Sequence, residues 1–425
     1  MGRLKESAFT RDRMLSFKKM IMIIVNLARK TLQLELNMFT KNINCEDVSK
    51  QAFSKARKNL NPKVFGLLNE KFLSEFYTDN DIKTLHGFRV FAVDGSKIQL
   101  PFSKEIVQEY GCSGNQFGAA IPMAQTSTLF DVLNKVTVHS IIAPNTSSER
   151  NLAKQHLEQL RIIDTQTEFD KTGIKDLLLY DRGYPSTELF INLAKEKKDF
   201  LMRCKRDFCA EVKDALANGK TDVVVEIDIS EKRKCANSAL GLRLLKINAN
   251  AKIKVRILVF ELSSGELEIL ITSLIDQNKF ARKFLFEFYN LRWGTEENNK
   301  FHKAIAQLEN FSGKSKVSVE QDYYATIFTC NVESILAQEA LEEVNALLKD
   351  KDLKYEYTVN KNIALGSLKD ELIYVLLAGV GFDEFCDKIK KRMIHSLVPI
   401  RKNRSFPRRN KCPYRKYSMN NRSCL

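Results

Sequence analysis

The spacing of hydrophobic residues changes along the chain, and each change predicts a different kind of structure. Over residues 13–76, apolar residues recur every three or four positions, which predicts amphipathic helices. From residue 86 the apolar residues form short runs that are typical of β-strands. These runs occupy 88–100, 124–133, 135–143, 176–183 and 198–205. Two capped helical patterns alternate with the later strands, so the sequence predicts a mixed α/β sheet.

The second half of the chain has strand patterns first and helical patterns afterwards. Residues 220–275 contain strand patterns alone, with a hairpin signal at "SSGE", and they predict an all-β insertion. Residues 281–352 return to a helical period. A shorter helical pattern at 367–392 leads into a basic tail.

Net charge indicates a polyanionic partner. The 425 residues carry 68 Lys and Arg against 52 Asp and Glu, a net charge of +16. Such an excess favours nucleic acid or an anionic membrane surface. From Lys388 to the C-terminus there are thirteen basic residues and no acidic one, so the charge is concentrated in the tail. We interpret this tail as disordered until it meets DNA.

The apolar runs and the cysteines indicate the cellular compartment in which the protein is expected. The runs at 20–28 and 372–382 are shorter than the roughly 20 residues that span a bilayer, so no membrane association is expected. The nine cysteines are scattered without a CxxC pair, which indicates free thiols in a reducing compartment. We therefore expect a cytoplasmic protein.

Three carboxylates are candidates for chemistry. Asp94 and Asp181 each follow an apolar strand, in "VFAVDG" and "LLLYDRG". Either one alone is also explained as a turn former. Together with Glu296 they form the kind of oxygen-ligand set that Mg²⁺ prefers, and two such ions can drive phosphodiester cleavage without a covalent enzyme intermediate.

The segment "YNLRWGTEENNKFHKA" (289–304) allows two interpretations. In a continuous helix Tyr289, Arg292, Glu296 and Lys303 would share one narrow face, as in the wall of an active site. Glu296 also lies four residues before Lys300, as in an ordinary ion-paired surface helix. The segment by itself leaves both interpretations open.

These blocks resemble a known family. "FAVDGSKIQLP", "LLLYDRGYPS" and "YNLRWGTEENNKFHKA" are similar to the three signature blocks of the DDE transposases of bacterial insertion sequences, in the group called insertion sequence family four. The C-terminal signature of that group, Tyr-x2-Arg-x3-Glu-x6-Lys, is met by Tyr289, Arg292, Glu296 and Lys303. "QAFSKARKNLNPKVF" and "SFPRRNKCPYRKYS" are similar to N-terminal and C-terminal blocks of the same enzymes.

The resemblance implies a ribonuclease-H-like catalytic domain, interrupted by the all-β insertion. We expect five segments: a helical N-terminal DNA-binding region (1–85), the first part of the catalytic domain (86–205), a β-rich insertion (206–275), the second part of the catalytic domain (276–352), and a C-terminal helical segment with the basic tail (353–425).

The resemblance also implies residue roles. Asp94 would bridge two Mg²⁺ ions, while Asp181 and Glu296 would each hold one, and Mn²⁺ would substitute for Mg²⁺. Tyr289, Arg292 and Lys303 would contact DNA phosphates.

Further residues near these motifs carry weaker interpretations. Arg182 and Lys97 lie beside the aspartates and are either DNA contacts or solvated neighbours. Trp293 is expected to pack under the sheet, Glu149 to cap a helix or support the fold, and His302 to lie on the surface.

The function expected from the resemblance is DNA transposition. The protein would bind double-stranded DNA at the terminal inverted repeats, cleave there by metal-assisted hydrolysis and transfer the 3′ hydroxyl ends to target DNA. It would act as a homodimer on paired ends in the bacterial nucleoid, and a hairpin intermediate is compatible with the resemblance. Two alternatives are a related metal-dependent nuclease without strand transfer and a decayed copy that only binds DNA.

Overall fold

The computed structural model describes residues 2–10, 14–27, 30–79, 82–114, 120–169, 172–229, 252–349, 351, 353–378 and 381–401. The helices within them are α1 (Phe17–Asn26), α2 (Leu32–Asn42), α3 (Lys50–Arg57), α4 (Lys63–Asp79), α5 (Lys104–Tyr110), α6 (Glu149–Thr167), α7 (Thr187–Lys195), α8 (Ala210–Ala217), α10 (Arg282–Asn290), α11 (Trp293–Ala304), α12 (Lys316–Leu348), α13 (Lys361–Ala378) and α14 (Phe382–Ile394). The strands are β1 (Phe88–Gln99), β2 (Cys112–Gly114), β3 (Ala120–Asp131), β4 (Val136–Pro144), β5 (Lys175–Tyr180), β6 (Asp199–Cys204), β7 (Asp222–Asp228), β8 (Lys252–Glu261), β9 (Leu267–Thr272), β10 (Glu356–Val359) and β11 (Leu397–Ile400).

The central sheet is mixed and has nine strands among the described residues. Strand β1 pairs antiparallel with β3, which pairs antiparallel with β4, and on its other side β1 runs parallel to β5 and β5 parallel to β6. The remaining strands continue the sheet in the order β6-β9-β8-β7. The predicted mixed α/β sheet is confirmed, and its strand order is consistent with a ribonuclease-H-like fold.

The all-β insertion expected at 220–275 is not confirmed. The described strands β7, β8 and β9 of this range extend the central sheet through the β6–β9 pairing, and helix α8 precedes them within the wider segment 206–275. One of the strand patterns of this range, "LRLLKIN" at 242–248, lies outside the described residues. The strand periods of β7, β8 and β9 were predictable from sequence, but their pairing partner was not, because pairing depends on contacts between distant segments.

Helices cover both faces of the sheet, and β1 is apolar on both sides for this reason. Phe91 and Val93 join a core with residues of α4, α6, α7 and α8, whereas Val90 and Ala92 join a core with α10. Successive side chains of a strand point to opposite faces, so a strand covered on both faces needs an unbroken apolar run. That run ends at Asp94.

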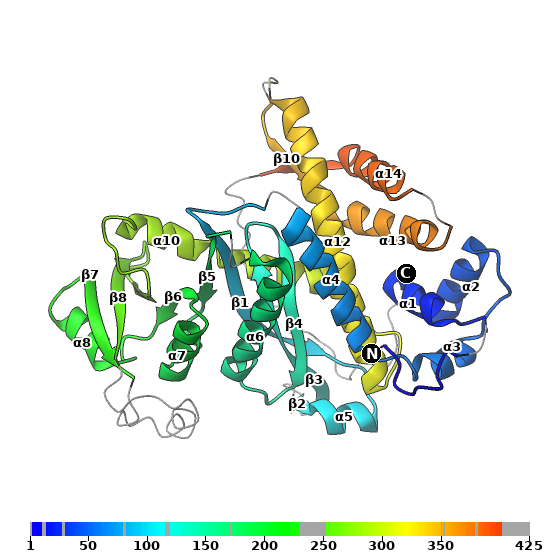
Figure 1. Cartoon of the computed structure of the whole chain (residues 1–425), viewed down its shortest axis with the longest axis horizontal. Helices are drawn as coiled ribbons and strands as arrows, with labels where there is room; N and C mark the ends of the chain where they lie inside the picture. The colour runs from blue at the N-terminus through cyan, green and yellow to red at the C-terminus, as the bar shows by residue number, and fades with distance from the viewer. Residues whose placement is uncertain are drawn as a thin grey trace.

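A second group of helices packs on the far side of α12. Figure 1 shows α12 (yellow) running between the sheet and the group formed by α1, α2, α3, α13 and α14. Buried residues of these helices share one hydrophobic core with α12. The predicted helical character of 13–76 is confirmed. Every helix among the described residues is too short or too polar to cross a bilayer.

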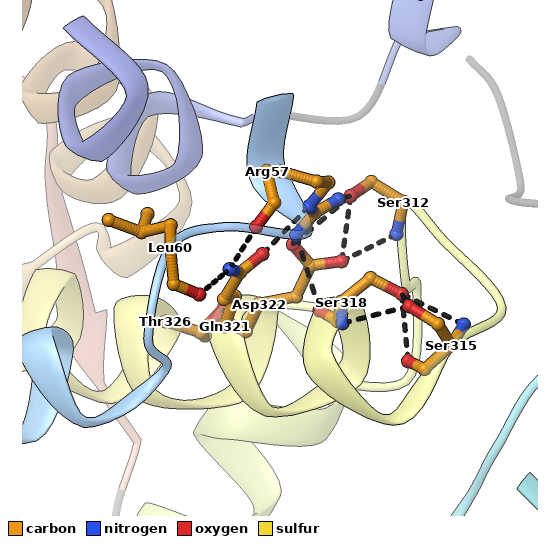
Figure 2. A network of polar contacts seen from close by, with 8 residues as sticks. All are labelled: Arg57, Leu60, Ser312, Ser315, Ser318, Gln321, Asp322 and Thr326. Carbon is orange, nitrogen blue, oxygen red and sulfur yellow. Dashed lines mark hydrogen bonds and ion pairs between the residues drawn. The ribbon is translucent and has the colours of Figure 1, made fainter. Parts of the chain in front are cut away.

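A buried polar network fixes α3 to the start of α12 (Figure 2). Arg57 is 3% exposed and donates hydrogen bonds to Gln321 Oε1 (2.8 Å), Asp322 Oδ1 (2.9 Å) and Ser312 Oγ (2.7 Å). Gln321 Nε2 donates in turn to the backbone carbonyl oxygens of Arg57 (3.0 Å) and Leu60 (2.7 Å). The inner face of α3 therefore packs against the helical core, and its outer face is exposed at Lys50 and Lys55.

The start of the basic tail is ordered, which corrects the expectation of disorder from Lys388 onward. Helix α14 extends to Ile394 and buries Ile389 and Met393, and β11 pairs antiparallel with β10. These residues are ordered because their apolar side chains complete the core around α12. The rest of the tail, 402–425, lies outside the described residues.

A buried ionic network joins β1 to β5 on the α6 side of the sheet. Arg89 is fully buried and donates to Asp176 Oδ1 (2.8 Å) and Asp164 Oδ1 (2.6 Å). Lys198 Nζ donates to the other oxygens of both aspartates, at 2.6 and 2.5 Å. Arg89 and Lys198 hold the pKa of the Asp176 carboxyl below its usual value although burial opposes this shift. Two cations and two anions thus balance in the interior.

We expect Arg89→Met to lower the free energy of unfolding by roughly 3–5 kcal/mol, because it leaves two buried carboxylates with one cation. Urea unfolding would measure the loss. Lys71→Ala is the matched control, since Lys71 forms an exposed i,i+4 ion pair with Glu75, and such a pair contributes about 0–1 kcal/mol. Equal effects of the two substitutions would contradict the assigned role of Arg89.

Candidate active site

Asp94 and Asp181 leave neighbouring parallel strands at the same level of the sheet. The register of β1 and β5 pairs Val93 with Tyr180, and each aspartate is the next residue along its chain. Asp94 still belongs to β1 and lies opposite Thr128 of β3, whereas Asp181 begins the turn after β5. The two strand-end carboxylates predicted from sequence therefore lie on adjacent strands.

Glu296 lies on α11, and the helix expected at 289–304 is interrupted. Helix α10 ends at Asn290 and α11 begins at Trp293, with backbone hydrogen bonds from Gly294 N to Leu291 O (2.9 Å) and from Thr295 N to Arg292 O (3.0 Å) between them. Bonds of this i→i+3 type tighten the helix locally. Tyr289 and Glu296 thus belong to consecutive helices, and angles for one continuous helix do not apply across the junction.

Helix α11 contacts β1 along the segment that carries Asp94. Asn299 Nδ2 donates a hydrogen bond to Asp94 Oδ2 at 3.0 Å. One turn further on, Lys303 Nζ donates to Ser96 Oγ (2.6 Å) and to the carbonyl oxygen of Lys97 (2.7 Å). The helix that carries Glu296 is therefore tied to the strand that carries Asp94.

Electrostatic interactions link the three carboxylates. Burial is the main cause that raises the pKa of Asp94, Glu296 and Glu149 add to it, and Arg292 and the hydrogen bond from Asn299 act in the opposite direction, so that the pKa is raised to about 6. Burial lowers the pKa of Arg292, but Tyr289, Asp181 and Glu296 together outweigh burial and raise it. Arg292 thus interacts with both Asp181 and Glu296, and its Nη2 donates to Glu296 Oε1 at 3.1 Å.

Glu149 is a fourth carboxylate at this place, where the sequence indicated only helix capping or fold support. It is the first residue of α6, and its Oε1 accepts a hydrogen bond from Gln125 Nε2 at 3.2 Å. The carboxylate lies so close to Gly95 that a Cβ atom there would collide with it and with Gln125. Its proximity to Asp94 depends on the packing of α6 against the sheet, for which the sequence contains no local signal.

Tyr289 and Trp293 flank Arg292. The Arg292 guanidinium lies 5.7 Å from the Tyr289 ring centroid and 5.1 Å from that of Trp293. Tyr289 is 3% exposed and its hydroxyl is buried, so its oxygen does not lie on the surface. The expectation that Trp293 packs under the sheet is wrong, because 53% of its surface is exposed. The junction between α10 and α11 turns Tyr289 inward and Trp293 outward.

The remaining predicted residues differ in exposure. Lys97 and Arg182 are exposed beside Asp94 and Asp181, whereas Lys303 is half-buried and bonded to β1. His302 is 2% exposed, which corrects its expected surface position, and burial together with Lys361 lowers its pKa to about 4. His302 therefore faces the interior, where a neutral imidazole is tolerated.

The donor set suits a divalent cation in its chemistry. Carboxylate oxygens of Asp94, Asp181 and Glu296 are the ligands that Mg²⁺ and Mn²⁺ prefer, and a cation would stabilise the ionised form of Asp94, which burial and the neighbouring acids disfavour. As the side chains lie, no group of three or more acidic, His or Cys residues within the described ranges is close enough to enclose an ion. The chemistry of these three carboxylates therefore fits a divalent cation, although their side chains do not enclose a site among the described residues.

Comparison with known proteins identifies a family. A family model described as "Transposase DDE domain" matches residues 85–332, more than half of the chain. Among solved structures, the chain is similar to a piggyBac transposase in a synaptic complex with hairpin DNA, determined by cryo-EM. This similarity has a TM-score of 0.44 and 9% sequence identity, and it covers 89% of this chain and 75% of that chain. No curated protein matches the chain by sequence.

We expect Asp94→Asn to stabilise the metal-free protein at pH 7.5 and to have little effect near pH 3.5. The folded-state pKa of Asp94 is raised, so ionised Asp94 destabilises the fold increasingly as pH rises from its ordinary value towards about 6. Asparagine is neutral throughout and keeps an oxygen for Asn299. The gain above pH 6 should be roughly 1–3 kcal/mol, since one pKa unit corresponds to about 1.4 kcal/mol.

Thermal melts with EDTA at both pH values would measure this difference. Asn298→Asp is a control for the general effect of changing the charge of α11. Asn298 donates its hydrogen bond to Thr137 Oγ1 and not to Asp94. A variant Asp94→Asn that melts below the wild type at pH 7.5 would contradict the raised pKa of Asp94.

Proposed function

The chain belongs to the transposase DDE domain family, and we propose that it is the DNA transposase of a bacterial insertion sequence of family four. It would bind the terminal inverted repeats of its element, cleave the DNA there and join the freed 3′ ends to target DNA. The Tyr-x2-Arg-x3-Glu-x6-Lys spacing at 289–303 supports the assignment to this group.

One observation carries the proposal. Asp94 and Asp181 emerge side by side from parallel strands, and the helix bearing Glu296 is hydrogen-bonded to Asp94 through Asn299. All three carboxylates lie within the residues matched by the family model. Partial burial and the nearby Glu296 and Glu149 raise the pKa of Asp94, so its ionised form destabilises the fold unless it serves a ligand, and this favours a metal-dependent role over a structural one.

The carboxylates would divide two divalent cations between them. Asp94 would bind both ions, and Asp181 and Glu296 would each bind one. When bound, two Mg²⁺ ions activate the attacking oxygen and stabilise the leaving oxygen of a phosphodiester, and Mn²⁺ would substitute for Mg²⁺.

The cationic residues would hold the DNA backbone. Arg292 has a planar fork that matches a phosphate, and it is bonded to Glu296, so a bound phosphate would compete for the guanidinium and free the carboxylate. Lys303, Lys97 and Arg182 would add phosphate contacts on the same side. Tyr289 was expected to contact a phosphate, but its hydroxyl is buried, so it would instead support the Arg292 guanidinium, which lies 5.7 Å from its ring centroid.

Both chemical steps exchange one phosphorus–oxygen bond for another. In cleavage a water oxygen bonds to phosphorus and gives up a proton, the bond from phosphorus to the 3′ oxygen breaks, and that oxygen takes up a proton to become the 3′ hydroxyl. In strand transfer this hydroxyl oxygen attacks a target phosphodiester and loses its proton as the target's own 3′ oxygen leaves. Since both steps are displacements at phosphorus, one site can serve both.

Other regions would complete the assembly. The helical region 1–85 would bind DNA through the exposed outer face of α3, which carries Lys50 and Lys55. Two protomers would act on paired ends in the bacterial nucleoid. Residues 276–352 would form the second part of the catalytic domain, and the tail beyond Arg401 would bind DNA by charge.

We expect Asp94→Ala, Asp181→Ala and Glu296→Ala each to abolish Mg²⁺-dependent cleavage of an end-bearing duplex while end binding persists. Loss of a metal ligand removes the chemistry and leaves the phosphate contacts intact. Gel assays of nicked, cleaved and joined products would measure the loss. Glu297→Ala is the matched control, because Glu297 is exposed on the same helix.

The reaction products distinguish the proposed transposase from the two alternative functions. Cleavage without joined product would indicate a metal-dependent nuclease, and binding without cleavage by the wild type would indicate a decayed copy. A single alanine variant that still cleaves at the wild-type rate would remove that residue from the site.

Deletion of residues 402–425 should weaken DNA binding and flatten its dependence on salt. This segment carries eight basic residues and no acidic one. For every phosphate that the protein no longer neutralises, the slope of log K against log salt should become shallower by about 0.9. Fluorescence anisotropy at several salt concentrations, on end-bearing and unrelated duplexes, would measure both effects, and an unchanged slope would show that the tail does not touch DNA.

A further inference from the structure

Helix α11 presents two successive asparagines to different partners. Asn299 Nδ2 donates to Asp94 Oδ2 at 3.0 Å, and Asn298 Nδ2 donates to Thr137 Oγ1 at 3.0 Å. Successive helical residues point about 100° apart, so only one of them can face β1 at this level. The amide that faces the candidate active site is the one at Asn299.

The position of this amide is fixed by the helix around it. Lys303, four residues on, holds the same face of α11 against Ser96 and the carbonyl oxygen of Lys97. On the other side of Asn299, Glu296 accepts from Arg292 at 3.1 Å. Asn299 therefore lies between two anchored residues, and its donor meets Asp94 in a fixed direction.

We propose that Asn299 is a positioning residue for the metal-binding carboxylate of Asp94. This inference rests on the proposed function. A carboxylate offers about four lone-pair positions, and Asn299 occupies one of them, so the others remain for cations while the group is kept from rotating. Hydrogen bonds that orient a ligating carboxylate typically contribute a factor of about 10–100 to metal affinity.

The chemical type of the side chain supports this role. A lysine at 299 would neutralise Asp94 and compete with the cation, and an acidic residue would add a further repelling charge beside Asp94, Glu296 and Glu149. The neutral amide donates a hydrogen bond without either effect. Asn299 is not one of the four signature positions in 289–303, so the sequence pattern alone did not indicate it.

Metal affinity of the full chain tests the proposal. Mn²⁺ binding, followed by loss of the free-ion EPR signal on titration, should weaken about 10–100-fold in both Asn299→Ala and Asn299→Leu. Asn299→Leu keeps the size and branching of the side chain, adds no charge and removes the donor, so it separates hydrogen bonding from packing. Asn298→Ala is the matched control and should bind Mn²⁺ as the wild type does.

Further measurements distinguish the possible failures. Thermal melts and metal-free binding of an end-bearing duplex should be nearly unchanged in Asn299→Leu, which excludes loss of fold as the cause. Wild-type Mn²⁺ affinity in Asn299→Leu, with affinity abolished in Asp94→Ala, would overturn the role of Asn299 and leave the proposed function standing. Mn²⁺ affinity in Asp94→Ala equal to that of the wild type would overturn both.

Discussion

The register between β1 and β5 is the constraint on which the candidate active site depends. A shift of one residue in a strand turns every side chain to the opposite face of the sheet. Arg89 and Asp176 pair across these strands, and five residues later along each strand come Asp94 and Asp181. The buried ion pair at one end and the two acids at the other therefore belong to one register. Any pairing that separated the acids would also separate Arg89 from Asp176 and leave charges buried without partners.

The third carboxylate depends on a different set of contacts. Glu296 comes from a helix that follows the whole sheet in sequence, and Asn299 and Lys303 attach this helix to β1. Beyond α11 the chain enters α12, whose first turns are bound to α3 through Arg57. The candidate site and the exposed basic face of α3 are thus connected through consecutive packed elements. DNA that contacts both would meet them in a fixed relative position.

The candidate active site brings carboxylates close together, although their negative charge does not stabilise the fold. Burial and neighbouring acids raise the pKa of Asp94, and Arg292 and Asn299 offset this only in part. The Glu149 carboxylate approaches position 95 so closely that a Cβ atom there would collide with it. Glycine at this position therefore leaves room for the carboxylate. An arrangement that is unfavourable in the apoprotein and favourable with cations is expected of a site that binds metal and polyanion together.

The sequence by itself determined the type and order of most of the longer elements and the position of Asp94 and Asp181 at the ends of apolar strands. Period, caps and turn residues act over a few positions, so β1, β5, α6 and the end of the apolar run at Asp94 could be predicted from neighbouring residues. The spacing of Tyr289, Arg292, Glu296 and Lys303 was likewise readable in the chain.

Only the tertiary structure decided where these pieces meet. It attached β7, β8 and β9 to the central sheet, turned Trp293 outward, buried His302 and brought Glu149 against Gly95. It also ordered the chain as far as Arg401. Each of these outcomes depends on burial or pairing between residues far apart in the chain. Local periodicity carries no information about such partners, because the free energy of a contact depends on both of the chain segments that form it.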